Sequence, residues 1–257
     1  MAHPCVPVDT QIPEIPATVA PRTDSEGKAI RNRILLSIPD DEFISLRPLL
    51  EQVEMPQYKI FYEQGAKIEH VYFLNEGMVS LVVLAKDGRS VEVGITGNEG
   101  VVGAPLAFGF ESAPMRAIMQ IKGQGLRIDA TTLEDRFSKS PELRCLIEQY
   151  VMTQQLQVAQ LAACNRLHDM DQRLARWLLM CQDTTNSENL PLTHEFIAQM
   201  LGAGRPTVTI AAGVLERAGL IANTRGSVRI VNRKRLEDAA CECYRVIQNY
   251  NGRFAMK

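Results

Sequence analysis

The segment from residue 190 to 221 constrains the fold most, because it encodes two short helices joined by a tight, glycine-containing turn. Thr193 is a suitable N-cap for the first helix, and Glu195 suits the positive end of that helix. Gly202-Ala203-Gly204 then forms the turn, since a glycine can leave a helix in the left-handed conformation. The second helix starts near Arg205. Together these features predict a helix-turn-helix.

The second helix separates its side chains into two faces. One face is apolar or small and is expected to pack inward, with Val208, Ala211, Ala212, Leu215 and Gly219. The opposite face has small side chains and is nearly free of acidic residues. Its outward residues are Pro206, Thr209, Ile210, Gly213 and Arg217, and Arg205 and Thr207 lie at its flanks. Such a face fits the DNA major groove, which is about 12 Å wide and presents each base pair distinctly.

The residue types on this face match the groups that DNA presents. Arg205 can donate two hydrogen bonds to guanine O6 and N7, and Ile210 or a threonine methyl can contact a thymine methyl. Thr193 and Thr207 suit phosphate oxygens, which position a protein without reading sequence. The residues ANTRGSVRIVN that follow predict a β-hairpin wing whose tip contacts phosphate. The expected DNA-contacting residues are Thr193, Arg205, Pro206, Thr207, Thr209, Ile210, Arg217 and Arg225.

Short β-type runs separated by turn residues occupy the chain from about residue 55 to 130. The runs are Tyr58–Tyr62, His70–Leu74, Met78–Leu84, Ser90–Ile95 and Gly125–Asp129. Asp87-Gly88 between valine-rich runs is a strong hairpin signal. The spacing predicts an antiparallel, jelly-roll-like β-roll over residues 34–139, and an α+β fold for the whole chain. Residues 1–33, with five prolines among the first 21, are expected to be a flexible tail.

A change of periodicity at Ser140 predicts a long helix over residues 140–168. Its stripe consists of Leu143, Ile147, Tyr150, Gln154, Val158, Leu161 and Asn165. A helix of about 40 Å is expected to pack against its own copy in a homodimer, with Gln154 and Asn165 fixing the register. The alternative is a helix buried within a monomer. Asp169 is expected to cap the next helix, Met170–Cys181, and to act as a hinge before the DNA-binding module, residues 169–257. A polar loop, Asp183–Asn189, follows that helix.

The chain resembles the Crp/Fnr family of transcription regulators from about residue 35 to 240. The resemblance lies in VYFLNEGMVSLVVLAKDG, TGNEGVVG, the capped hinge at Asp169, and LTHEFIAQMLGAGRPTVT with its wing. It implies an effector-sensing β-roll, a dimerisation helix, a winged helix-turn-helix on a two-fold symmetric site, and RNA polymerase as a further partner. Arg205 and Thr193 match the family's recognition arginine and phosphate-contacting cap. Pro206 and Ile210 replace its usual glutamate and second base-reading arginine, so the half-site is expected to differ.

The resemblance also places the effector pocket at Gly103, Ala104 and Arg116. Cyclic-nucleotide binders of the family use a Gly-Glu pair for the ribose and an Arg-Ser/Thr pair for the phosphate. Here the first pair is Gly103-Ala104, and Arg116 is offset by about three positions, so the charged partners of a cyclic nucleotide are missing. No cofactor is expected, and a cyclic nucleotide is disfavoured.

The cysteines do not suggest a metal site. Cys241 and Cys243 form a C-x-C pair, but the sequence shows no second pair or nearby histidine to complete a tetrahedral site. Cys5 is alone in the N-terminal region, where an iron–sulfur cluster needs about four thiolates. A haem is left open, although His70 and the cysteines show no particular pairing. We expect Cys164, Cys241 and Cys243 to be core thiols.

Charge and composition limit the remaining classes of function. Residues 1–165 carry 15 Lys and Arg against 21 Asp and Glu, whereas residues 166–257 carry 13 against 9. This asymmetry is expected when only the C-terminal part meets a polyanion. The scattered cysteines and the lack of an apolar run of roughly 18 residues favour a cytoplasmic protein. The chain is thus expected to be a homodimeric DNA-binding regulator without catalytic residues. The alternative is a small-molecule-binding β-roll whose C-terminal module mediates protein interaction.

Overall fold

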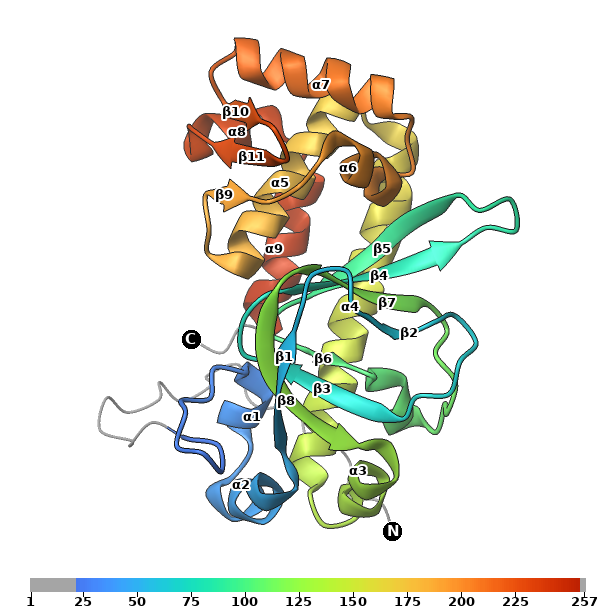
Figure 1. The fold of residues 1–257 in the computed structure, drawn as a ribbon, viewed down its shortest axis with the longest axis vertical. Helices are drawn as coiled ribbons and strands as arrows, with labels where there is room; N and C mark the ends of the chain where they lie inside the picture. The colour runs from blue at the N-terminus through green and yellow to red at the C-terminus, as the bar shows by residue number, and fades with distance from the viewer. Residues whose placement is uncertain (1–21, 255–257) are drawn as a thin grey trace.

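The computed structural model describes residues 22–254, with side chains described for residues 22–251. The chain forms an N-terminal β-roll and a C-terminal helical module, connected by the long helix α4, Pro141–Leu167 (Figure 1). Helical segments precede, interrupt and follow the β-roll strands: α1 (Arg33–Ser37), α2 (Asp40–Leu46), η1 (Arg47–Leu49), η2 (Ala104–Phe108) and α3 (Ala130–Phe137).

The β-roll consists of two four-stranded antiparallel sheets with a common core. The first has the order β1 (Glu51–Met55), β8 (Gly123–Asp129), β3 (His70–Leu74), β6 (Val101–Val102). The second has the order β2 (Ile60–Tyr62), β7 (Arg116–Ile121), β4 (Met78–Leu84), β5 (Ser90–Thr96). Gly88 adopts φ +86° in the predicted hairpin between β4 and β5. The α+β class and the antiparallel β-roll are confirmed.

Three strands of the β-roll were not predicted from the sequence: β1, β6 and β7. Strand β1 reads EQVEM, and most of its side chains are at least partly exposed, so it lacks the alternation of apolar and polar residues that marks a half-buried strand. Its pairing with β8 over five residues holds it in the sheet. Residues 51–55 therefore form a strand because they pair with a distant segment of the chain, and their own sequence pattern does not reveal it.

Residues 22–32 pack against the β-roll. Arg22 Nη1 donates to the carbonyl of Leu35 over 2.6 Å, and Asn32 Nδ2 donates to the carbonyls of Leu74 and Gly100 over 3.1 and 2.8 Å. The prediction of a flexible tail over residues 1–33 is therefore wrong from residue 22 onward, because buried hydrogen bonds fix this segment. The rest of that tail, including Cys5 and its prolines, lies outside the described residues.

The stripe of α4 predicted to face a second copy is covered by the chain itself. Four of its residues are buried in the cores of the two modules: Leu143, Ile147, Tyr150 and Leu161. Gln154 Nε2 donates to the Tyr150 hydroxyl over 3.1 Å, and Asn165 Oδ1 accepts from Arg173 over 2.9 Å. The prediction that this stripe is the dimer seam, with Gln154 and Asn165 as register residues, is wrong, because both modules of the same chain pack on it.

The C-terminal module begins at Asp169, whose side chain and Gln172 form a capping box at the start of α5, Met170–Thr185. Helix α5 extends beyond the predicted end at Cys181, and β9 (Asn189–Leu190) pairs with β11, so the expected polar loop at 183–189 is shorter. The remaining elements are α6 (His194–Leu201), α7 (Arg205–Arg217), β10 (Ile221–Thr224), β11 (Ser227–Ile230), α8 (Arg233–Ala239) and α9 (Cys243–Phe254). No helix in residues 22–254 is long and apolar enough to cross a membrane.

The C-terminal module is packed directly on the second sheet of the β-roll (Figure 1). Trp177 on α5 donates its indole hydrogen to Glu92 Oε1 on β5 over 2.8 Å, and both side chains are buried. The Tyr58 and Phe196 rings lie 5.8 Å apart, centre to centre. These contacts, which we call the junction, fix the position of α6 and α7 relative to the β-roll.

Candidate DNA interface

Helices α6 and α7 form the predicted helix-turn-helix. The Thr193 hydroxyl accepts the Phe196 backbone N–H over 3.2 Å and caps α6. Gly202 ends α6 in the left-handed conformation at φ +62°, and Gly204 precedes α7 in an extended conformation. The turn therefore has the glycine chemistry that the sequence suggests, and it sets the angle between the two helices.

The inward face of α7 holds the helix on the module. Val208, Ala211, Ala212 and Leu215 are each at most 4% exposed and belong to the same core as Trp177. The prediction that Gly219 packs inward is wrong, because α7 ends at Arg217 and Gly219 is exposed in the following turn at φ +71°. There glycine permits a sharp exit from the helix, since φ is positive.

The outward face of α7 is open in the protomer. Gly213 is partly buried, and the other residues predicted on it are exposed: Arg205, Pro206, Thr207, Thr209, Ile210 and Arg217. Ile210 is 68% exposed although it is a large apolar side chain. A Cβ added at Gly213 would lie 3.3 Å from Arg217 Nη1, so this arginine lies across the bare backbone of the glycine. The outward face thus has a glycine without a side chain at its middle and the positive charges of Arg205 and Arg217 at its two ends.

Three polar contacts made by two residues of α6, His194 and Glu195, were not predicted from the sequence. Arg205 Nε lies 3.9 Å from Glu195 Oε2, and both side chains are more than half exposed, so the pair is weak and leaves the arginine available. His194 contacts Thr209 Oγ1 through Nδ1 and Asn223 Oδ1 through Nε2, each over 3.2 Å. This histidine joins α6, α7 and β10, and its place just after the N-cap was its only signal in the sequence.

The wing is a β-hairpin with a two-residue turn. Thr224 pairs with Ser227, and Arg225 and Gly226 form the turn, with Gly226 at φ +83°. Arg225 is exposed at the tip. Strand β9 adds a third strand on the far side of β11, where the sequence predicted the end of a polar loop.

The residues predicted to form an effector pocket do not form a phosphate site. Arg116 on β7 makes a bidentate pair with Glu63, over 2.7 and 3.0 Å, so its charge is already neutralised. Gly103 adopts φ +103° beside Val71, and Ala104 is buried. A cavity of about 240 Å³ lies instead where β5, α4, α5 and α9 meet, and none of the three predicted residues lines it.

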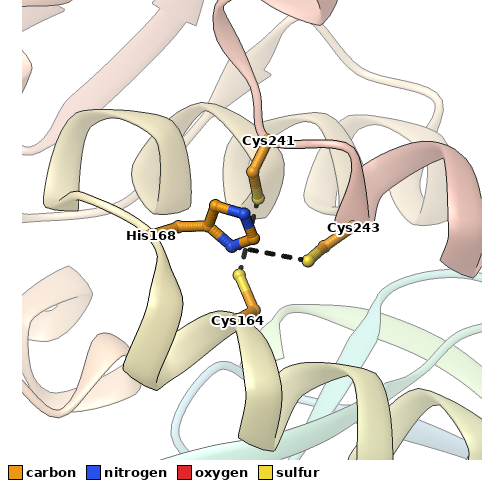
Figure 2. Close-up of side chains that lie close together, drawn as sticks. All are labelled: Cys164, His168, Cys241 and Cys243. Carbon is orange, nitrogen blue, oxygen red and sulfur yellow. Dashed lines mark hydrogen bonds between the residues drawn. The ribbon is translucent and has the colours of Figure 1, made fainter.

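A cluster of cysteine and histidine side chains lies beside the predicted hinge (Figure 2). Cys241 and Cys243 meet Cys164 and His168, and the four potential ligand atoms lie within 4.8 Å of one another. The expectation that no histidine lies near the C-x-C pair is wrong, because folding brings the end of α4 against the connection between α8 and α9. Asp169 itself is extended between α4 and α5.

Comparisons with known proteins agree with this arrangement. The chain matches the family model of the Crp-like helix-turn-helix domain over residues 172–239 and that of the cyclic nucleotide-binding domain over residues 52–140. It is 27% identical over 183 residues to the global nitrogen regulator of Synechocystis sp., covering 68% of this chain and 81% of the relative. It is 22% identical to the anaerobic regulatory protein of Bacillus subtilis, and the match covers 79% of this chain and 92% of that relative.

Solved structures share the fold. A putative transcriptional regulator of the Crp/Fnr family from Eubacterium rectale matches with a TM-score of 0.63 at 18% identity, covering 80% of this chain and 97% of that one. FixK2 from Bradyrhizobium japonicum matches with a TM-score of 0.62 at 18% identity, and the match covers 75% of this chain and 98% of FixK2. From these matches and the exposed winged helix-turn-helix, the chain belongs to the Crp/Fnr family of transcription regulators, which bind DNA and are not enzymes.

Proposed function

We propose that this protein is a cytoplasmic homodimer that inserts α7 of each protomer into the major groove at a two-fold symmetric DNA site. The observation that carries the proposal is the outward face of α7, which is exposed along its length and ends in Arg205 at the N-terminal side. Two such helices about 34 Å apart would enter successive major grooves on one side of the duplex.

Each exposed residue has a role that its chemistry suggests. Arg205 reads a guanine through two parallel hydrogen bonds once DNA displaces its weak partner Glu195. Ile210 and the methyl group of Thr209 contact thymine methyls, with Pro206 and Arg217 beside them. The Thr193 hydroxyl accepts a backbone hydrogen bond, so its own hydrogen is free for a phosphate, and Thr207 and Arg225 contact phosphates as well.

A different face of α4 supports the dimer. Exposed apolar or small side chains recur along the helix at steps of three or four residues and so share one face: Met152, Leu156, Ala159, Ala163 and Leu167. Met152 and Leu167 are 61% and 73% exposed, which is costly for apolar groups without a partner. Leu156→Glu is expected to convert the dimer to monomers in analytical ultracentrifugation. An unchanged sedimentation coefficient would place the dimer contact elsewhere.

The β-roll acts as the sensor in this proposal, without a cyclic nucleotide bound through Gly103, Ala104 and Arg116. The support is the bidentate pairing of Arg116 with Glu63, which already occupies the guanidinium face that a phosphate would need. An effector would act by favouring the DNA-competent arrangement of the two modules, with the hinge at Asp169 as the moving element. RNA polymerase is the further partner that the family resemblance suggests.

A binding titration at two salt concentrations tests the proposal against a C-terminal module that docks on protein. Wild-type protein and a fluorescent random-sequence duplex are followed by anisotropy. Binding to DNA should weaken steeply between low and high salt, since each phosphate contact releases a counterion. Absence of binding at low salt, or binding that salt does not affect, would favour the protein-docking alternative.

A further inference from the structure

Four side chains converge where α4 ends and α9 begins. Cys164 and His168 lie one helical turn apart at the end of α4, and Cys241 and Cys243 flank Glu242 where the connection from α8 enters α9. Cys164 Sγ lies 3.5 Å from Cys241 Sγ, and His168 Nδ1 lies 3.6 Å from Cys243 Sγ. A tetrahedral Zn²⁺ ion with its usual bond lengths separates such ligand atoms by about 3.5–3.8 Å.

We propose that Cys164, His168, Cys241 and Cys243 bind one Zn²⁺ ion, which fastens α9 to the end of α4. All four tetrahedral positions are then protein ligands, as in structural zinc sites, and none is left for a substrate. Binding displaces the three thiol protons to solvent, because the thiolate is the ligating form.

The histidine is oriented as a metal ligand would be. Its Nδ1 faces the sulfur atoms (Figure 2), and its Nε2 lies 3.1 Å from Glu242 Oε1. Histidine ligands commonly donate their second ring hydrogen to a carboxylate, which fixes the ring and makes the ligating nitrogen more basic. Glu242 stands between the two cysteines in the sequence, so the same short segment supplies two ligands and the carboxylate.

Further neighbours stabilise negative charge on the sulfurs. Gln160 Nε2 donates to Cys243 Sγ over 3.1 Å. Arg176 is 2% exposed, its Nε has no hydrogen-bond partner among the described residues, and its charge acts on Cys164 and Cys241 as well as on the carboxyl group of Glu92. A buried cation requires a compensating charge. Zn²⁺ with three thiolates carries one net negative charge, which suits this arginine.

The ligand set also indicates which metal would bind. Thiolate and imidazole ligands in tetrahedral array suit Zn²⁺ and are poor ligands for Mg²⁺ or Ca²⁺. Ligand atoms within 4.8 Å of one another surround a single ion, whereas an iron–sulfur cluster spreads its thiolates around several metal atoms. Cys164 and Cys241 are free thiols whose sulfurs lie 3.5 Å apart, whereas a disulfide bond is about 2.05 Å long.

The ion would restrain the hinge. His168 directly precedes Asp169, and Cys243 is the first residue of α9, so the ion connects the hinge to the last helix of the DNA-binding module. Removing the ion should therefore increase hydrogen exchange of backbone amides in α9 and around residues 167–170. This readout does not require DNA, so it tests the zinc site even where the proposed DNA contacts fail.

Metal analysis of the full-length protein tests the proposal. We expect about one zinc per chain by plasma mass spectrometry, in line with a closed four-ligand site. Co²⁺ exchanged into the site should give thiolate charge-transfer absorption and the intense visible bands of tetrahedral cobalt. Cys241→Ser and Cys243→Ser should lose the metal, whereas Cys181→Ala, which removes a buried thiol outside the cluster, should keep it. His168→Cys should retain metal and strengthen the charge-transfer band.

The supporting carboxylate gives a test that does not depend on removing a ligand. Glu242→Gln should weaken zinc affinity about 10–100-fold in competition with a chelator. Asp238→Asn, an exposed carboxylate on α8, should leave the affinity unchanged. Wild-type protein without zinc or tetrahedral Co²⁺ absorption, a Cys164–Cys241 disulfide in the reduced-purified protein, or equal metal loss in Cys181→Ala would overturn the proposal.

Discussion

The outward face of α7 consists of exposed side chains from one helix, whereas the junction consists of buried side chains that lie far apart in the sequence. Arg205 and Ile210 touch little of their own chain, but Trp177 contacts Glu92 across 85 positions. The two regions therefore have different roles in the protein. The outward face can change its residues at little cost in stability and so can specify DNA, while the junction sets where that face points.

The junction is a buried polar network as well as an apolar contact. Glu92 Oε1 accepts from Trp177, and Glu92 Oε2 accepts from the Ser80 hydroxyl over 2.6 Å. Burial raises the pKa of Glu92 to about 7, despite these hydrogen bonds and the charge of Arg176. The junction therefore contains a carboxyl group that titrates near neutral pH.

The largest expected effect is at Trp177. Trp177→Ala should lower the free energy of unfolding by about 3–5 kcal/mol, because it leaves a cavity between the two modules. Circular dichroism in denaturant measures this, since the change removes the protein's one tryptophan and its fluorescence. Ile210→Ala on the outward face should change stability by less than about 0.5 kcal/mol. Equal destabilisation by both would contradict the separation of the two regions.

The pH dependence of the junction comes next in size. Between its ordinary pKa of 4.5 and its folded pKa of about 7, Glu92 keeps its proton in the folded protein and loses it in the unfolded chain. The stability that Glu92 contributes is thus fully present below pH 4.5. As the pH rises through 7 this contribution is lost, and the free energy of unfolding falls by about 3 kcal/mol. Glu92→Gln should remove that part of the pH dependence in denaturation at pH 5 and 8. An unaltered pH profile would show that Glu92 titrates normally.

Sequence reasoning succeeded where contiguous residues decide the structure. The Thr193 cap, the Gly202 turn and the Arg225-Gly226 hairpin depend on neighbours in the chain, so their chemistry is visible in the sequence. The apolar stripe of α4 showed that this face is covered, but periodicity does not say whether a second chain or the same chain covers it. The cysteine cluster was missed because Cys164 and Cys241 lie 77 positions apart, and only the docking of α9 on α4 brings them together.

On the outward face, Arg205 should give the largest loss of specific binding. Arg205→Ala should weaken binding to the specific site by about 1–3 kcal/mol and relax the preference at one base pair. The guanidinium would otherwise make two hydrogen bonds to guanine. Anisotropy titrations on specific and random duplexes measure both values. An equal loss on the two duplexes would mean that Arg205 contacts phosphate only.

The smallest effect is expected at the wing. Arg225→Ala should weaken binding equally on specific and random DNA and reduce the slope of log K against log salt by about one unit. Unfolding in denaturant should be unchanged, because the side chain is exposed at the hairpin tip. A slope equal to that of the wild type would exclude a phosphate contact by the wing.

Selection of binding sites from a random duplex pool tests most directly whether the outward face of α7 reads DNA. Wild-type protein should select a two-fold symmetric motif whose half-sites lie about one helical turn apart. Ile210→Arg, which places a guanine-reading side chain on that face, should enrich guanine at one position in both half-sites. Selection of the same motif by both proteins, or of no symmetric motif by the wild type, would contradict the account.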